Sequence, residues 1–258
     1  MAEATTSETG SAPAAAAPAA APAQEYSPSS ETSKLITAWE HPKGEDAART
    51  RSSIKPHWPK GYSGLTIGMG YDLKYHTADE LRKDWGDALS PEQIERLEAY
   101  TPTINPKGKQ VPPKKKPNQA AIVATKDIEV TYSESVRVFE QKIQPKIESQ
   151  AYKMFPGLET MDPYTQAAVV SMVYNRGQSM GKKGTLRRTH FMEIKEAVVK
   201  RDTTAIAATI RKMKTEHQHP DTKKGLHRRR EAEALTIENN KTAVDAWYGR
   251  GPAVGAWP

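Results

Sequence analysis

The chain has 258 residues, enough for one large hydrophobic core or two small ones, and a formal net charge of +7. It contains no cysteine, which excludes disulfides and thiolate catalysis and leaves oxidising and reducing compartments equally open. The first 33 residues hold four carboxylates and no Lys or Arg, so the rest of the chain carries +11. A domain this basic is drawn to polyanions such as nucleic acid, an acidic membrane surface or an anionic cell-wall polymer.

The two ends of the chain differ in composition from its middle. Residues 11–24 are almost entirely alanine and proline, so we expect residues 1–32 to form a disordered, solvated tail. Acidic residues stand where a signal peptide would be positively charged, and no apolar run reaches the length of a membrane span. We therefore expect one folded domain over 33–245, a C-terminal tail over 246–258, no membrane span and no cleaved signal peptide.

A first helix is predicted from Ser33, because the apolar residues that follow share one face, and Pro42 ends it. Glu40 therefore lies in the last turn. The negative end of the helix dipole and the neighbouring Trp39 both favour a protonated carboxyl group there, the form that a general acid needs. A solvated glutamate at a helix end is the alternative interpretation of the same position.

Residues 64–73, Gly-Leu-Thr-Ile-Gly-Met-Gly-Tyr-Asp-Leu, are the most informative stretch. Apolar residues alternate with small or polar ones, the period-2 pattern that predicts a half-buried strand. One face then presents Thr66 and Asp72, and the glycines between them leave that face open to a ligand. We expect this strand, together with residues 43–63, to form a small β-lobe that carries the floor of a catalytic cleft.

The remainder is predicted to be mainly helical, which makes the fold class α+β, mainly α. Capping-box patterns begin helices at Thr77, Ser90 and Thr131. Asp162 begins a strongly apolar helix that ends at Gly177, the expected central buried helix. Further helices are marked by apolar spacing or caps over 120–123, over 191–198, from Asp202 and from Gly225. Pro145 is expected to kink or break the helix that contains it.

Residues 101–118 are rich in proline and lysine, so we expect an exposed basic insertion. A solvated loop is the simplest interpretation, and a specific binding site is the alternative.

The sequence gives less support to metal, nucleophilic or nucleic-acid chemistry. The histidines match no zinc-binding pattern and no nucleophile elbow is present, so we expect no metal and no cofactor. Arg229 and Arg230 lie at helical spacing from Glu233, which favours ion pairs within one helix over specific nucleic-acid binding.

A glycosidase needs a protonated carboxyl group at the leaving oxygen, and a second carboxylate or a held water at the anomeric carbon. Glu40 and Asp72 fit these roles, and the hydroxyl of Thr66 can hold a water. One geometric condition follows. Uninterrupted strand from Thr66 to Asp72 spans about 20 Å, so Gly68 and Gly70 must bend the chain for the acidic side chains to reach one bond.

These features resemble the phage-type lysozymes and, more closely, the pesticin-like muramidases of bacteriocins, type VI secretion effectors and some endolysins. The likeness spans roughly residues 33–240. It rests on Glu40, on 64–73, and on two helical signatures, Ala-Ala-Val-Val-Ser-Met-Val-Tyr-Asn-Arg-Gly at 167–177 and Gly-Leu-His-Arg-Arg-Arg-Glu-Ala-Glu-Ala at 225–234. The aspartate follows the threonine, as in the pesticin arrangement. His41-Pro42 after the glutamate and the basic insertion depart from the family pattern.

The resemblance implies a lysozyme-like fold with a small β-lobe, a larger helical lobe and a cleft between them. It implies that Glu40 is the general acid, that Thr66 positions the water and that Asp72 is the catalytic aspartate. Substrate contacts are expected from five residues within these motifs: Gly68, Gly70, Tyr71, Asn175 and Arg176.

The activity implied is that of a muramidase, a glycoside hydrolase that cleaves the β-1,4 bond between N-acetylmuramic acid and N-acetylglucosamine in peptidoglycan. We expect a monomeric antibacterial toxin, made in the cytoplasm without a signal peptide and acting in the periplasm or cell wall of a target cell. A delivery protein or chaperone and an immunity protein are the expected partners. The alternative is a catalytically inactive lysozyme-like module that binds cell wall or nucleic acid through its basic surface. Effector or endolysin delivery, and retention or inversion, stay open.

Overall fold

The computed structural model describes residues 29–40, 54–58, 63–216 and 220–240. Most of the predicted N-terminal tail, all of the predicted C-terminal tail and most of the segment 43–63 lie outside these ranges. Within them the protein is mainly helical and carries two small antiparallel sheets, which confirms the predicted α+β class. None of the described helices combines the length and the apolar character that crossing a membrane requires.

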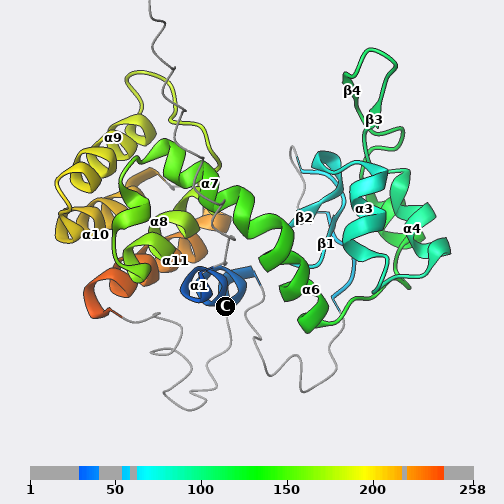
Figure 1. Cartoon of the computed structure of the whole chain (residues 1–258), viewed down its shortest axis with the longest axis horizontal. Helices are drawn as coiled ribbons and strands as arrows, with labels where there is room; N and C mark the ends of the chain where they lie inside the picture. Colours follow the sequence, from blue (N-terminus) through cyan, green and yellow to red (C-terminus); the bar gives the residue numbers. More distant parts are fainter. Residues whose placement is uncertain (1–28, 41–53, 59–62, 217–219, 241–258) are drawn as a thin grey trace, which may run out of the picture.

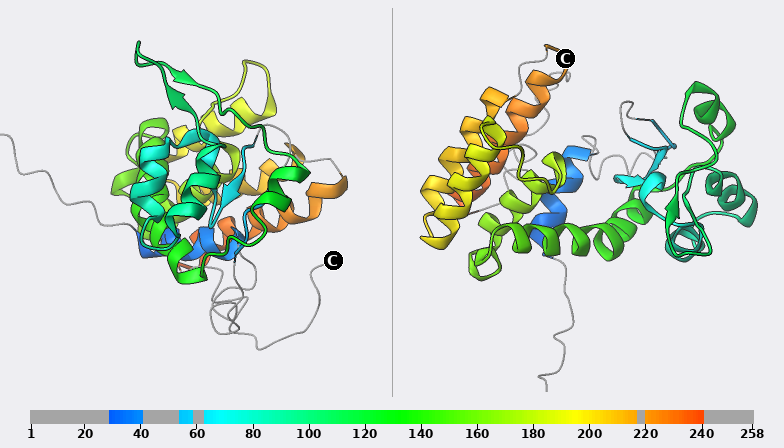
Figure 2. Two further views of the ribbon diagram at one scale, coloured as in Figure 1. Left: turned by 90° about the vertical axis from the view of Figure 1, so that its right-hand side faces the viewer. Right: turned by 90° about the horizontal axis from the view of Figure 1, so that it is seen from above.

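Two groups of elements lie on either side of one long helix (Figure 1). The sheet-bearing part contains β1 Thr66–Ile67, β2 Tyr71–Asp72, α3 Ala78–Trp85, α4 Pro91–Glu98, β3 Thr103–Ile104, β4 Gln110–Val111 and α5 Gln119–Ala124. The helical part contains α1 Ser30–Glu40, α8 Pro163–Arg176, α9 Leu186–Val199, α10 Thr203–Lys212 and α11 Pro220–Asn239. Seen from above, the long helix connects the two parts (Figure 2).

The connecting helix is built from α6 Tyr132–Val138, a π-helical segment at Phe139–Ile143 and α7 Gln144–Met154. The π segment ends two residues before Pro145, which has no N–H to donate and whose ring crowds the preceding turn. Of the kink or break predicted at this proline, the break does not occur, because the helix continues as α7 after the widened π-helical turn.

Local capping signals determine where most helices begin. The three predicted capping boxes, at Thr77, Ser90 and Thr131, all form, with the hydroxyl accepting an N–H and the later Glu or Gln bonding back. Asp162 caps α8 as predicted, and Gly177 ends it with a φ of 75°. Two starts differ from prediction, because α1 begins three residues earlier, at Ser30, and α11 five residues earlier, at Pro220.

Helix α8 is the central helix of the helical part. Its residues from Ala167 to Val173 are buried, and it packs against α1, α7 and α11. This fixes the C-terminal end of α1, where Glu40 lies, and the C-terminal end of α8, where Asn175 lies, on the same structural unit.

The predicted single strand over 64–73 is instead a tight hairpin. Gly68 and Gly70 adopt left-handed backbone angles, with φ of 53° and 77°, which residues other than glycine rarely adopt. β1 and β2 consequently pair antiparallel, and Thr66 is the direct partner of Asp72. An isolated bridge joins His57 to Thr66 of β1, and a second one joins Ile54 to Val130.

The basic insertion is mostly exposed from Thr103 onward, as predicted, whereas Thr101 and Pro102 are buried, and it is not structureless. β3 and β4 pair as an exposed hairpin that projects from the sheet-bearing part (Figure 1). Gly108, with a φ of 72°, forms its turn. The short helical turns at Leu73–Tyr75, Leu158–Thr160 and Met213–Glu216 complete the described elements.

Candidate active site

A cleft of about 600 Å³ receives residues from both parts of the protein. Six of the eight predicted site residues line it: Glu40, Thr66, Gly68, Gly70, Asp72 and Asn175. They come from α1, from the β1–β2 hairpin and from the end of α8. The chain therefore bends at Gly68 and Gly70, as the sequence required. The bend brings Thr66 and Asp72 to the cleft that Glu40 also lines.

The carboxylate of Asp72 is held by backbone groups. Both of its oxygens accept the N–H of Gly64, at 3.0 and 3.1 Å, and Oδ1 also accepts the N–H of Lys74 at 2.9 Å. A side chain at position 64 would overlap Oδ1, so glycine is required for this approach. The hydroxyl of Thr66 lies on the same hairpin, 3.5 Å from the carbonyl of Gly64, which leaves it available for a shorter bond.

Glu40 is anchored by an arginine from a distant segment. Its Oε1 lies 2.9 Å from Nη1 of Arg229, which is buried while the Glu40 side chain is 29% exposed. Arg229 also bonds Glu233 at 3.3 Å and the hydroxyl of Ser171 at 3.2 Å. Glu40 is thus an exposed residue at a helix end, as in the alternative interpretation, but its carboxylate has a buried cationic partner. The predicted ion pairs of Arg229 and Arg230 with Glu233 are confirmed.

Tyr174 on α8 lies between the Glu40–Arg229 ion pair and the β1–β2 hairpin. The Arg229 guanidinium lies 5.7 Å from the centroid of its ring, within cation–π range. On the other side, a side chain at position 70 would overlap the Tyr174 hydroxyl, so Gly70 allows the hairpin to approach α8. Burial raises the pKa of the Tyr174 phenol above its usual range, and the nearby Glu40 charge adds to this effect.

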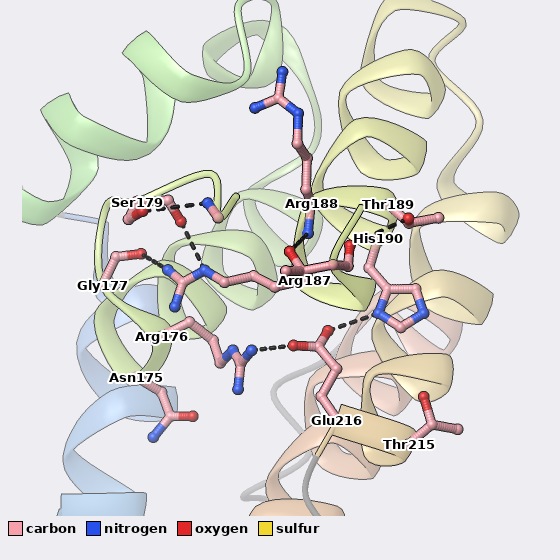
Figure 3. Close-up of polar contacts among 12 residues, drawn as sticks. Asn175, Arg176, Gly177, Ser179, Arg187, Arg188, Thr189, His190, Thr215 and Glu216 are labelled. Carbon is pink, nitrogen blue, oxygen red and sulfur yellow. Dashed lines mark hydrogen bonds and ion pairs between the residues drawn. The ribbon is translucent and has the colours of Figure 1, made fainter. Parts of the chain in front are cut away.

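Two residues predicted to contact substrate, Tyr71 and Arg176, are not among those that line the cleft. Tyr71 is fully buried, with its hydroxyl 3.1 Å from a carboxylate oxygen of Asp84 and its ring stacked on His76. Burial and then the Asp84 charge raise the pKa of the Tyr71 phenol. Arg176 is also turned away from the cleft. It forms an ion pair with Glu216, which in turn lies 2.6 Å from Nδ1 of His190 (Figure 3).

The loop after α8 forms one wall of the cleft and is clamped by Arg187. Gly177 and Gln178 line the cleft directly. Arg187 on α9 donates from Nε to the carbonyl of Ser179 at 2.7 Å and from Nη2 to that of Gly177 at 3.0 Å (Figure 3). Asn175 is held from the other side, since its Oδ1 accepts Nη2 of Arg230 at 3.1 Å.

Sequence reasoning missed several residues that the cleft contains, among them His57, Tyr75, His76, Lys146, Gln150, Tyr174 and Gln178. Tyr174 was recoverable, because it directly precedes Asn175 in the quoted helical signature. The others come from separate elements, and no local pattern groups them. His76 is buried, and burial followed by the charge of Lys146 lowers its pKa.

Metal coordination finds no geometric support in the part of the chain that the structure describes, where no cluster of three or more metal-binding side chains occurs. His41, His217 and His219 lie outside the described residues.

A family model described as a domain of unknown function, DUF8812, matches residues 38–230. That match covers most of the chain and nearly all of the described residues. No curated protein matches the chain.

Proposed function

We propose, for a chain that belongs to the DUF8812 family of domains of unknown function, that it is a muramidase acting on bacterial peptidoglycan. The observation that carries the proposal is the β1–β2 hairpin, which sets Thr66 and Asp72 side by side in a cleft that Glu40 also lines. An acid, an aspartate and a hydroxyl are the groups that glycoside hydrolysis requires.

Each residue has one role in this mechanism. Glu40 donates a proton to the glycosidic oxygen as the bond breaks. Asp72, fixed by the N–H groups of Gly64 and Lys74, stabilises the positive charge that develops on the sugar ring. Thr66 holds the water that attacks the anomeric carbon. Arg229 positions Glu40 by tying the end of α1 to α8 and α11.

The character of the cleft supports a polysaccharide substrate. Its lining combines backbone at three glycines with amide side chains and tyrosines, which suit the hydroxyls and flat faces of sugars. The strongly basic chain after residue 33 favours an anionic wall polymer over neutral glycans. The two groups of elements around the cleft agree with lysozyme-like lobes, the finer fold that we propose.

In this proposal the protein is an antibacterial toxin. It acts in the periplasm or cell wall of a target cell after synthesis in the cytoplasm, with a delivery protein or chaperone and an immunity protein as partners.

Release of dye from labelled peptidoglycan tests the proposal. Wild type is expected to release dye, and Glu40→Gln and Asp72→Asn are each expected to lose about 100-fold or more, the range for loss of a general acid or an electrostatic stabiliser. Asp79→Asn, a change at a carboxylate that is 93% exposed on α3, is the matched control and should retain full activity. Borohydride reduction of the products should label muramic acid ends. No release by wild type, or glucosamine ends, contradicts the proposal.

One observation favours the inactive module as a second candidate. Glu40 and Asp72 both have partners that would suffice for a structural role, an ion pair and a helix cap. In that case the protein binds sacculi or DNA in a salt-sensitive manner and releases no dye. The two substitutions then lower the melting temperature, and there is no turnover for them to change.

A further inference from the structure

A second groove, of about 410 Å³, lies beside the cleft on the sheet-bearing part. We call it the lysine groove. It is lined by three lysines and two aromatic residues, namely Lys74, Lys115, Lys116, Trp58 and Tyr100. Three prolines of the basic insertion complete this part of the lining. Every charged residue among the described lining residues is a lysine.

The second half of the basic insertion forms one wall of this groove. The N–H of Lys115 donates to the carbonyl of Ala99 at 3.1 Å, which ties the returning chain to the end of α4. Pro112, Pro113 and Pro117 restrict the backbone on either side of the lysines. Lys115 and Lys116 are exposed but attached to a fixed backbone, so this half of the insertion is more than a solvated loop.

Trp58 gives the groove a flat surface. Its indole N–H donates to the carbonyl of Ser63 at 3.2 Å, which fixes the ring, and the side chain is half-buried. Tyr100 lies buried below. A flat aromatic surface next to several ammonium groups suits a ligand that combines apolar atoms with carboxylates.

The groove is connected to the cleft in two ways. Ser63 lines both. In addition, Gly64 and Lys74 line the groove while their N–H groups hold the carboxylate of Asp72. A ligand in the groove therefore lies on the loop that fixes Asp72, next to whatever occupies the cleft.

We propose that the lysine groove binds the carboxylates of a stem peptide of peptidoglycan, while the glycan strand that carries this peptide occupies the cleft. The inference rests on the proposed function. It follows from charge and continuity, because the sugars of the strand bear no free carboxylate once the lactyl group is joined to the peptide. The negative charge of the substrate then lies on the peptide, next to the strand.

Binding experiments separate the groove from the chemistry. The full chain carrying Glu40→Gln, which stops turnover, is titrated against two probes prepared from walls without teichoic acid, so that phosphate supplies no charge. One probe is intact sacculi. The other is the same glycan after an amidase has removed the peptides and the lactyl carboxylates freed by that hydrolysis have been converted to neutral methylamides. The Lys115→Ala/Lys116→Ala pair is compared with Lys107→Ala/Lys109→Ala, which removes the same charge from the hairpin tip of the same insertion.

The protein is expected to bind intact sacculi more tightly than stripped glycan. The groove variant should lose about fivefold in affinity for intact sacculi, the effect of two exposed ion pairs, and nothing for stripped glycan. The tip variant should bind both probes with the same affinity as the Glu40→Gln protein that keeps all four lysines.

Equal losses on both probes, an equal loss in the tip variant, or no preference for intact sacculi overturns the inference. The readout is binding, so it is independent of turnover. If wild type binds with this preference yet releases no dye, the proposed function fails while the groove stands. If wild type hydrolyses both probes and the preference is absent, the groove fails while the function stands.

Discussion

Thr66 and Asp72 are direct partners across the β1–β2 pair, although the glycine-rich turn separates them in the chain. Side chains of directly opposed residues in an antiparallel pair project from the same face. The hairpin therefore places a hydroxyl and a carboxylate next to each other without help from the rest of the fold. Their distance from Glu40, in contrast, depends on how closely the hairpin approaches α8.

Gly70→Ala tests that approach, and Gly108→Ala is its matched control. Both positions have similar left-handed angles, with φ of 77° and 72°, so alanine strains both backbones by about 1 kcal/mol. Only at position 70 does the new methyl group overlap the Tyr174 hydroxyl, whereas position 108 faces open space. We expect Gly70→Ala to lower the free energy of unfolding by about 2 to 4 kcal/mol in urea denaturation. Equal losses of unfolding free energy at the two positions would show that the hairpin does not pack tightly against Tyr174 of α8.

The ion pair between Glu40 and Arg229 should be measurable as a coupling energy. A double-mutant cycle with Glu40→Gln and Arg229→Met, measured by urea denaturation, is expected to give about 1 kcal/mol, because Arg229 is buried and Glu40 is partly exposed. The exposed pair of Asp79 and Arg82 on α3 should give no measurable coupling. If the two cycles agree, Arg229 does not hold Glu40 in place.

Arg187→Met should loosen the wall of the cleft that follows α8. The substitution removes two bonds to the carbonyls of Gly177 and Ser179, so amide hydrogen exchange in 177–184 should accelerate. If the protein is a muramidase, KM should rise by about threefold to tenfold with little change in kcat, because the wall contacts substrate away from the reacting bond. Arg188→Met is the control, since that side chain points away from the loop (Figure 3). Unchanged exchange in the Arg187 variant would contradict the clamp.

His76 should make the fold sensitive to mild acid. Its pKa is lowered in the folded protein by burial and by the charge of Lys146, so below the unfolded pKa of about 6.5 the unfolded state binds more protons. Its contribution to stability is present above that pH and is lost as pH falls towards the folded pKa. His76→Phe, which keeps a ring against Tyr71, should therefore flatten the fall in unfolding free energy between about pH 7.5 and about pH 5. A variant with the wild-type pH slope would refute this assignment.

What the sequence predicted correctly is mostly local. Capping boxes at Thr77, Ser90 and Thr131 bond residues three positions apart, so the pattern and the structure contain the same information. The alternation over 64–73 also placed Tyr71 correctly among the apolar residues. Its predicted contact with substrate came from its place in the motif and contradicted that alternation.

What the sequence could not predict depends on contacts between distant segments. Arg229 lies 189 positions from Glu40, and its spacing to Glu233 indicated only a partner within the same helix. The glycine pattern showed that the chain could bend after Thr66. It did not show how far, because the left-handed angles that close the hairpin are permitted to glycine without being required. The lysine groove could not be predicted either, because it depends on a contact between separate segments and forms only where the insertion returns to α4.

The π-helical segment at Phe139–Ile143 links the geometry of the cleft to the residue count of a single turn. It lies within the helix that connects the two parts of the protein and adds one residue to an otherwise α-helical path. Because each α-helical residue advances the chain by about 100° around the axis, deleting one residue there would rotate α7 and all that packs on it relative to the hairpin. The helical phase of this one element therefore determines whether Tyr174 and Asp72 face the same space.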